Sequence, residues 1–79
     1  MRFRTIIVSY VDPLNEFMNE LKKYDFEPRG YNLTQGYIHE GWLTISAFKK
    51  LIDLLCNTSY KFTASQKFND DIWITINES

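Results

Sequence analysis

The stretch TISAFKKLIDLLCN, residues Thr44 to Asn57, has the clearest periodicity in the chain. Its large apolar residues recur at intervals of three and four, which places them on one side of an α-helix: Phe48, Leu51, Ile52 and Leu55. Lys49 and Asp53 are four residues apart on the solvent side. Such a helix is unstable alone in water, so the rest of the chain must cover its apolar side.

The residues at the two ends of this stretch are suited to begin and end a helix. Thr44 is a good N-cap, and Leu43 and Phe48 are spaced to form a hydrophobic staple around it. Asn57 tolerates a left-handed backbone, so we expect it to end the helix in that conformation.

Residues Arg2 to Val11 are rich in β-branched and aromatic side chains and predict the first strand. Apolar residues occur on both faces of this strand. We therefore expect a strand in the middle of a sheet, covered at least in part on both sides.

Asp12 and Pro13 then predict the start of a helix, with Asp12 as N-cap and Pro13 at the first helical position. The helix should continue to about Tyr24. Its apolar residues have the same spacing as those of the later helix: Leu14, Phe17, Met18 and Leu21. Acidic side chains occur at four-residue steps on its solvent side: Asp12, Glu16 and Glu20.

The segment between the two helices favours a hairpin with arms near Tyr31–Thr34 and Tyr37–Leu43, joined by a turn at Gln35-Gly36. A long loop with one short strand is the alternative. After the second helix, Tyr60 to Phe68 alternates in character and Asn69-Asp70 predicts a turn. The last strand then alternates cleanly, with isoleucine at positions 72, 74 and 76.

These elements predict one domain covering residues 1–79. The fold class is α+β: a two-layer sandwich of an antiparallel or mixed sheet with both helices on one face. The element order is β-α-β-β-α-β-β, for which a ferredoxin-like variant with one added strand is the nearest named topology. That topology has many unrelated functions.

Composition limits the class of protein. The formal net charge is −1, which argues against broad electrostatic attraction to duplex DNA or anionic membranes. No segment approaches the roughly 18 apolar residues needed to span a bilayer. A single cysteine, Cys56, excludes an intramolecular disulfide, and we expect it to be partly buried. We therefore expect a soluble cytoplasmic protein.

Residues that could carry chemistry are few. His39, beside Glu40 and near Tyr37, is the only histidine, and no nucleophile elbow, phosphate-binding glycine loop or metal-ligand spacing surrounds it. We interpret it as a surface histidine that can contribute a binding contact. A thiolate–imidazole pair between Cys56 and His39 is disfavoured because burial makes a thiol less reactive. We expect no enzymatic activity, no cofactor and no metal site.

Aromatic residues are the strongest indication of a binding role. Tyr31, Tyr37 and Trp42 cluster in the middle hairpin, and exposed rings of this type mark protein interfaces. The predicted partner-binding residues are Tyr31, Tyr37, His39, Trp42 and Trp73. The predicted partner is another protein, either a target or a second copy of the chain in a homodimer.

The size and the Asn-, Lys- and Ile-rich composition suit a phage or mobile-element product that inhibits or regulates a host protein. The alternative is a module that binds single-stranded nucleic acid on an aromatic and basic sheet face. Trp73 would form that face with Arg2, Arg4 and Tyr10 on a neighbouring strand.

Overall fold

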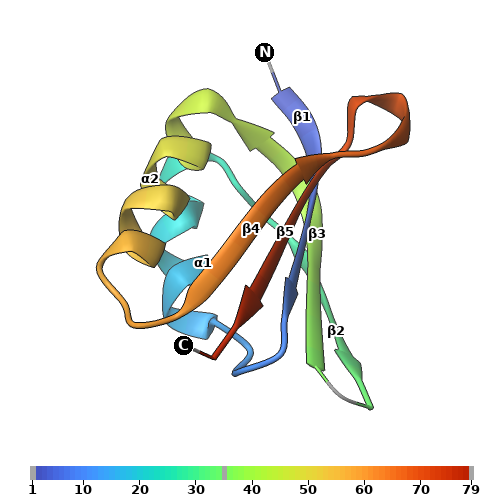
Figure 1. The fold of residues 1–79 in the computed structure, drawn as a ribbon. Coiled ribbons are helices and arrows are strands. Elements are labelled where there is room, and N and C mark those ends of the chain that lie inside the picture. The colour runs from blue at the N-terminus through green and yellow to red at the C-terminus, as the bar shows by residue number, and fades with distance from the viewer. Residues whose placement is uncertain (1, 35, 79) are drawn as a thin grey trace.

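A five-stranded mixed sheet and two helices make up the fold (Figure 1). The structure is a computed structural model that describes residues 2–34 and 36–78. Its elements in chain order are β1 (Arg2–Ser9), α1 (Asn15–Leu21), the short 3-10 helix η1 (Lys22–Tyr24), β2 (Arg29–Leu33), β3 (Gly36–Thr44), α2 (Ile45–Cys56), β4 (Lys61–Gln66), η2 (Phe68–Asp70) and β5 (Ile72–Asn77). The predicted α+β class and order of strands and helices are confirmed.

The strand order in the sheet is β2-β3-β1-β5-β4, with β1 in the middle as predicted. β1 is antiparallel to β3 but parallel to β5, so the sheet is mixed. The predicted ferredoxin-like order is wrong, because that order would place the strand after α2 directly beside β1. Here β5 occupies that place and β4 lies at the edge.

The side chains of the last two strands account for this order. β5 directs Ile72, Ile74 and Ile76 toward the helices, and Ile74 and Ile76 are completely buried. The corresponding row of β4 is less apolar and ends in Gln66, which is exposed. The more apolar strand therefore takes the inner position, where more surface is removed from water.

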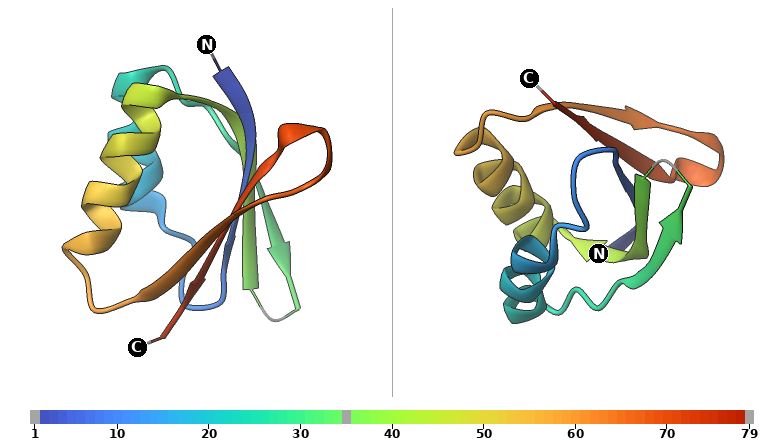
Figure 2. Two further views of the ribbon diagram at one scale, coloured as in Figure 1. Left: turned by 45° about the horizontal axis from the view of Figure 1, so that its top comes forward. Right: turned by 90° about the horizontal axis from the view of Figure 1, so that it is seen from below.

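Both helices lie on the same side of the sheet, which gives two layers (Figures 1 and 2). The core fills the space between the layers and contains residues from both helices, three strands and the connections: Ile7, Leu14, Met18, Leu21, Phe26, Leu43, Ala47, Leu51, Leu55, Ile74 and Ile76. No helix among residues 2–34 and 36–78 is long and apolar enough to cross a membrane.

α2 begins as predicted. The Thr44 hydroxyl accepts a hydrogen bond from the amide of Ala47 at 3.1 Å, which satisfies one of the free N–H groups of the first turn. The predicted left-handed end at Asn57 is wrong, because its φ is −90°. Asn57 ends the helix through its side-chain amide, which donates to the carbonyl of Asp53.

α1 begins later than predicted, at Asn15 instead of Pro13. The Asp12 carboxylate accepts a hydrogen bond from the amide of Leu14 at 2.8 Å, so it caps a local turn instead of the helix. Leu14 has a left-handed backbone with φ 54°, which breaks the helical path at the position where the prediction continued it. Its side chain is nevertheless buried in the core.

The middle segment forms the predicted hairpin and not the alternative long loop. β2 pairs with β3 in antiparallel register; β2 begins two residues before its predicted arm and ends one residue short of it, and β3 extends one residue beyond its arm at each end. The predicted turn at Gln35-Gly36 includes Gln35, which lies outside the described residues. The predicted turn at Asn69-Asp70 is confirmed, and both residues have positive φ. This turn bends to the side of the sheet away from the helices (Figure 2).

Candidate functional site

On the face of the sheet opposite the helices, the described chain places only the β4–β5 turn with η2, which bends to that side, so we call it the open face (Figures 1 and 2). Side chains on a strand alternate between faces, and residues paired across strands share a face. Because Ile7 and Ile74 face the helices, their neighbours along each strand point to the open face. The open face comprises Arg2, Arg4, Ile6, Val8 and Tyr10 from β1 and its end; Arg29 and Tyr31 from β2; Ile38, Glu40 and Trp42 from β3; Lys61, Thr63 and Ser65 from β4; and Trp73, Thr75 and Asn77 from β5.

Large aromatic side chains are exposed on this face. Trp42 is 58% exposed, Tyr10 52% and Tyr31 41%. Trp73 is half-buried and pairs with Ile6 of the central strand. These four rings come from four different positions along the chain, and only the sheet places them on one surface.

Beneath the rings, the middle of the open face is apolar. Ile6 and Val8 are each only 7% exposed, although no helix covers them. Their neighbours on β3 and β5 bury them: Ile6 lies between Glu40 and Trp73 in the register. The centre of this face is therefore apolar but covered by its own neighbours, and the aromatic rings around it supply the exposed apolar surface.

Four basic residues and one acidic residue point from the strands to the open face: Arg2, Arg4, Arg29 and Lys61 against Glu40. The face is thus basic although the whole chain has a formal net charge of −1. The Arg29 guanidinium lies over the ring of Tyr31 at 5.8 Å from its centroid, a cation–π geometry.

Carboxylates hold Arg4 on both sides. It pairs with Glu40 of the adjacent strand, and its Nη1 lies 2.9 Å from Oδ2 of Asp71 in the β4–β5 turn. The hydrogen bond to Glu40 is the largest cause of the raised pKa of Arg4, followed by that to Asp71. Arg4 therefore ties the turn to the sheet and offers less positive charge to a ligand than Arg2 or Arg29.

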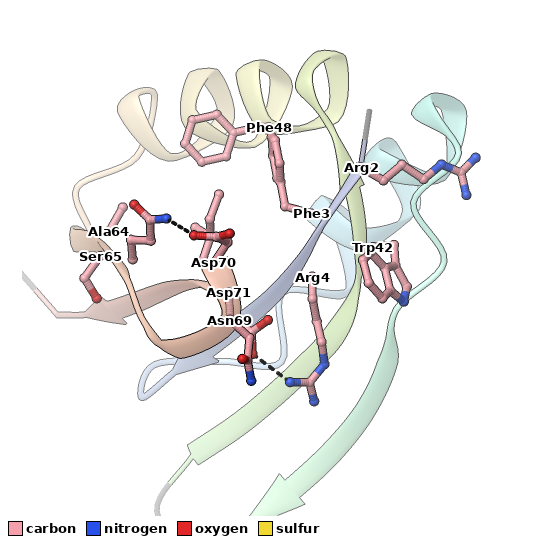
Figure 3. A pocket seen from close by; sticks show the side chains of 12 residues that line it. Arg2, Phe3, Arg4, Trp42, Phe48, Ala64, Ser65, Asn69, Asp70 and Asp71 are labelled. Carbon is pink, nitrogen blue, oxygen red and sulfur yellow. Dashed lines mark hydrogen bonds and ion pairs between the residues drawn. The ribbon is translucent and has the colours of Figure 1, made fainter.

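A cavity of about 660 Å³ lies at the end of the sheet, where β1 begins and the β4–β5 turn bends away (Figure 3). Phe3 and Phe48 line its helix side and pack edge to face, with ring centroids 6.5 Å apart. Trp42 borders the same cavity from the open face. A second hollow, of about 590 Å³, lies on the open face over Trp73 between the hydroxyl groups of β4 and the turn.

Two of the predicted binding residues lie elsewhere. His39 pairs with Ile7 in the register and so faces the helices, as does Tyr37 opposite Ser9. The interpretation of His39 as a surface histidine is wrong, because it is only 7% exposed. Its Nε2–H donates to the carbonyl of Pro13, and burial is the main cause of its lowered pKa. The structure thus gathers Tyr31, Trp42 and Trp73 and separates them from Tyr37 and His39.

His39 uses Nε2 for a structural contact, and Cys56 is exposed at the end of α2, which corrects the expectation that it is partly buried. Among residues 2–34 and 36–78, no group of three or more His, Cys, Asp or Glu side chains is placed to hold a metal ion.

Tyr10 and Arg29 are two exposed residues of the open face that the sequence did not assign to protein binding. The alternation in β1 assigned Tyr10 to the same face as Arg4, but Arg29 precedes the predicted hairpin arm and had no such indication. Comparison with protein-family models, with curated proteins and with solved structures found no match to this chain.

Proposed function

We propose that this chain is a small non-enzymatic protein-binding module whose contact surface is the open face. The observation that carries the proposal is the exposure of Trp42, Tyr31 and Tyr10 on one sheet surface that no helix covers. Tryptophan, tyrosine and arginine are the residues most enriched among those that dominate binding energy at protein interfaces. A monomer that exposes them together keeps this apolar surface in contact with water until a partner covers it.

The charge of the face defines the chemistry of the partner. Arg2 on β1 and Arg29 on β2 are exposed and flank β3, the strand that carries Trp42. A partner with an apolar patch bordered by Asp and Glu side chains would complement them, because complementary charge speeds encounter and selects the partner. That the partner is a cytoplasmic host protein inhibited by a phage or mobile-element product is the part of the proposal that rests on size and composition.

The test is affinity capture from cytosol, with the recovered proteins identified by mass spectrometry. We expect one stoichiometric partner, and Trp42→Ala and Tyr31→Ala should each reduce its recovery at least tenfold, about 1.4 kcal/mol. Tyr24→Ala is the matched control, since Tyr24 is also an exposed ring, 36%, but belongs to η1 outside the sheet. Normal recovery with both sheet variants, or equal loss with Tyr24→Ala, would contradict the proposal.

Single-stranded nucleic acid is a second candidate, favoured by the same combination of rings and arginine side chains. Bases stack on exposed aromatic rings, and Arg2 and Arg29 could contact phosphates. The neutralisation of Arg4 by Glu40 and Asp71 weighs against it. The two candidates differ in their response to salt and nuclease: nucleic-acid binding weakens steeply as salt rises, and the captured material disappears after nuclease treatment.

A further inference from the structure

The outer edge of β4 is open, and it has few of the features that protect strand edges. β4 pairs with β5 on one side only and lies last in the sheet (Figure 1). Natural edge strands avoid pairing with other molecules through charged residues, proline, bulges or inward-pointing charges. In β4, KFTASQ, Lys61 is the only charged residue, and there is no proline.

The register shows which backbone groups of β4 point outward. The amide of Tyr10 donates to the carbonyl of Ile76 at 2.9 Å, so the backbone groups of Ile76, and by alternation those of Ile74, point toward β1. The backbone groups of Thr75 and Trp73 then point toward β4, where they form hydrogen bonds with the backbone groups of Thr63 and Ser65. The N–H and C=O groups left on the outer edge of β4 are those of its other three residues: Phe62, Ala64 and Gln66.

A second copy of β4 can add to this edge in antiparallel orientation about a two-fold axis perpendicular to the sheet. Two registers pair five of the six residues of the strand: one centred on Thr63, which pairs residues 61–65, and one centred on Ala64, which pairs residues 62–66. In the register centred on Ala64, Lys61 would lie opposite Lys67 of the second copy, and opposed like charges destabilise a strand pair.

The register centred on Thr63 places no like charges opposite each other. Lys61 faces Ser65 of the second copy, and Phe62, which is half-buried, faces the exposed Ala64 on the helix side. Phe62 and Ala64 carry the outward backbone groups, so the pair exchanges four hydrogen bonds. Thr63 faces itself across the axis in a pair without hydrogen bonds, where cross-strand threonines contact each other.

We propose that two copies of this chain associate through β4 in the register centred on Thr63, to form one continuous ten-stranded sheet. The two-fold axis places both open faces on the same side of this sheet. The proposal does not depend on which molecule the open face binds. The contact is smaller than a standard protein interface, so we expect a dissociation constant on the order of 100 μM.

Disulfide crosslinking tests the register. In a Cys56→Ser background, which removes the exposed native thiol, Thr63→Cys should crosslink on mild oxidation. A pair without hydrogen bonds has a Cα–Cα distance of about 4.5 Å, within the range of disulfides. Ser65→Cys is the matched control, since the two copies of residue 65 would be roughly 13 Å apart. Equal crosslinking at both positions, or preferential crosslinking of Ala64→Cys, would overturn the proposed register.

Analytical ultracentrifugation of the wild-type chain tests the association itself. Ala64→Pro removes an outward N–H and should weaken association at least tenfold, while an edge strand tolerates a proline whose missing N–H faced solvent. By the same alternation the N–H of Asn32 points outward on β2, so Asn32→Pro is the matched control at the other edge. Circular dichroism checks that both variants fold. A wild-type chain that stays monomeric at about 1 mM, or equal effects of the two prolines, would refute the proposal.

Discussion

Trp73 of β5 lies opposite Ile6 of β1 in the parallel register, and this pair joins the exposed rim of the open face to its buried centre. Ile6 is buried and Trp73 is half-buried, so the indole covers part of the central strand. Trp42, on the other side of β1, is 58% exposed and covers much less. The two tryptophans therefore differ in what they contribute to stability.

Trp42→Ala should change the free energy of unfolding by less than about 0.5 kcal/mol, since most of its ring is in water. Trp73→Ala should cost about 2 kcal/mol, because most of a large apolar side chain loses its cover. Ile74→Ala, in the core, should cost roughly 2–5 kcal/mol. Urea denaturation measures all three. A Trp42→Ala variant as unstable as Ile74→Ala would show that the exposed ring has a structural role.

Gly41→Ala should destabilise the fold, whereas Gly30→Ala should not. A Cβ at Gly41 would lie 2.8 Å from Cε1 of Phe26, which is fully buried, and 3.2 Å from Cα of Pro28. Neither atom can move without disturbing the core, so we expect a loss of about 1–3 kcal/mol. At Gly30 the nearest atom is Nδ1 of His39, at an ordinary 3.5 Å. Thermal unfolding compares the pair, and equal midpoints would contradict this account of Gly41.

His39 should make stability depend on pH below its ordinary pKa of 6.5. Burial lowers its pKa in the folded chain, so the unfolded chain takes up the proton first as the pH falls. The stabilisation is complete above pH 6.5 and is lost as the pH falls toward the lowered pKa. An NMR titration of this single histidine gives the pKa directly. In His39→Gln the urea midpoint should depend less on pH between 7.5 and 5.5. An unchanged slope would show that His39 does not cause this pH dependence.

Tyr60→Phe should lower the urea midpoint at neutral pH. The Tyr60 hydroxyl donates to Oδ2 of Asp12, which links the start of β4 to the connection between β1 and α1. This hydrogen bond is the largest cause of the raised pKa of Tyr60, so its contribution persists below pH 10.0 and is lost as the pH rises through the raised pKa.

Tyr24→Phe is the control for that variant, since the Tyr24 hydroxyl makes no hydrogen bond within residues 2–34 and 36–78. Its midpoint should match that of the wild type. Spectrophotometric titration of the tyrosines should show one fewer high-pKa group in Tyr60→Phe. Equal midpoints for Tyr60→Phe and the wild type would mean that this contact contributes nothing.

Local sequence patterns predicted the elements of this fold well but not their arrangement. Thr44 and the apolar spacing after it define α2, because capping and amphipathicity act within a few residues. The start of α1 was misplaced, because the carboxylate of Asp12 caps a turn at Leu14 instead of the helix. The order of β4 and β5 depends on which strand buries more apolar surface against β1, and alternation in each strand alone does not decide it.

The same distinction applies to the candidate site. The sequence identified Trp42, Tyr31 and Trp73 as available rings, yet only the register shows that they share a face. Alternation along β3 separates Trp42 from His39, because residues an odd number of positions apart point to opposite faces. On the helix side His39 is buried, and the Pro13 carbonyl, 26 residues earlier in the chain, accepts its hydrogen bond. A contact that distant has no local signal.

The parallel pair of β1 and β5 also has a consequence for biosynthesis. Residues 5–9 are synthesised well before their neighbours at residues 72–76. On the ribosome, β1 therefore has only β3 beside it until residues 72–76 emerge. Until then the side of Ile7 that contacts β5 in the folded chain stays exposed to water. We expect stable folding to wait for release of this segment, and nascent chains that stop before residue 72 should be cleaved rapidly by protease.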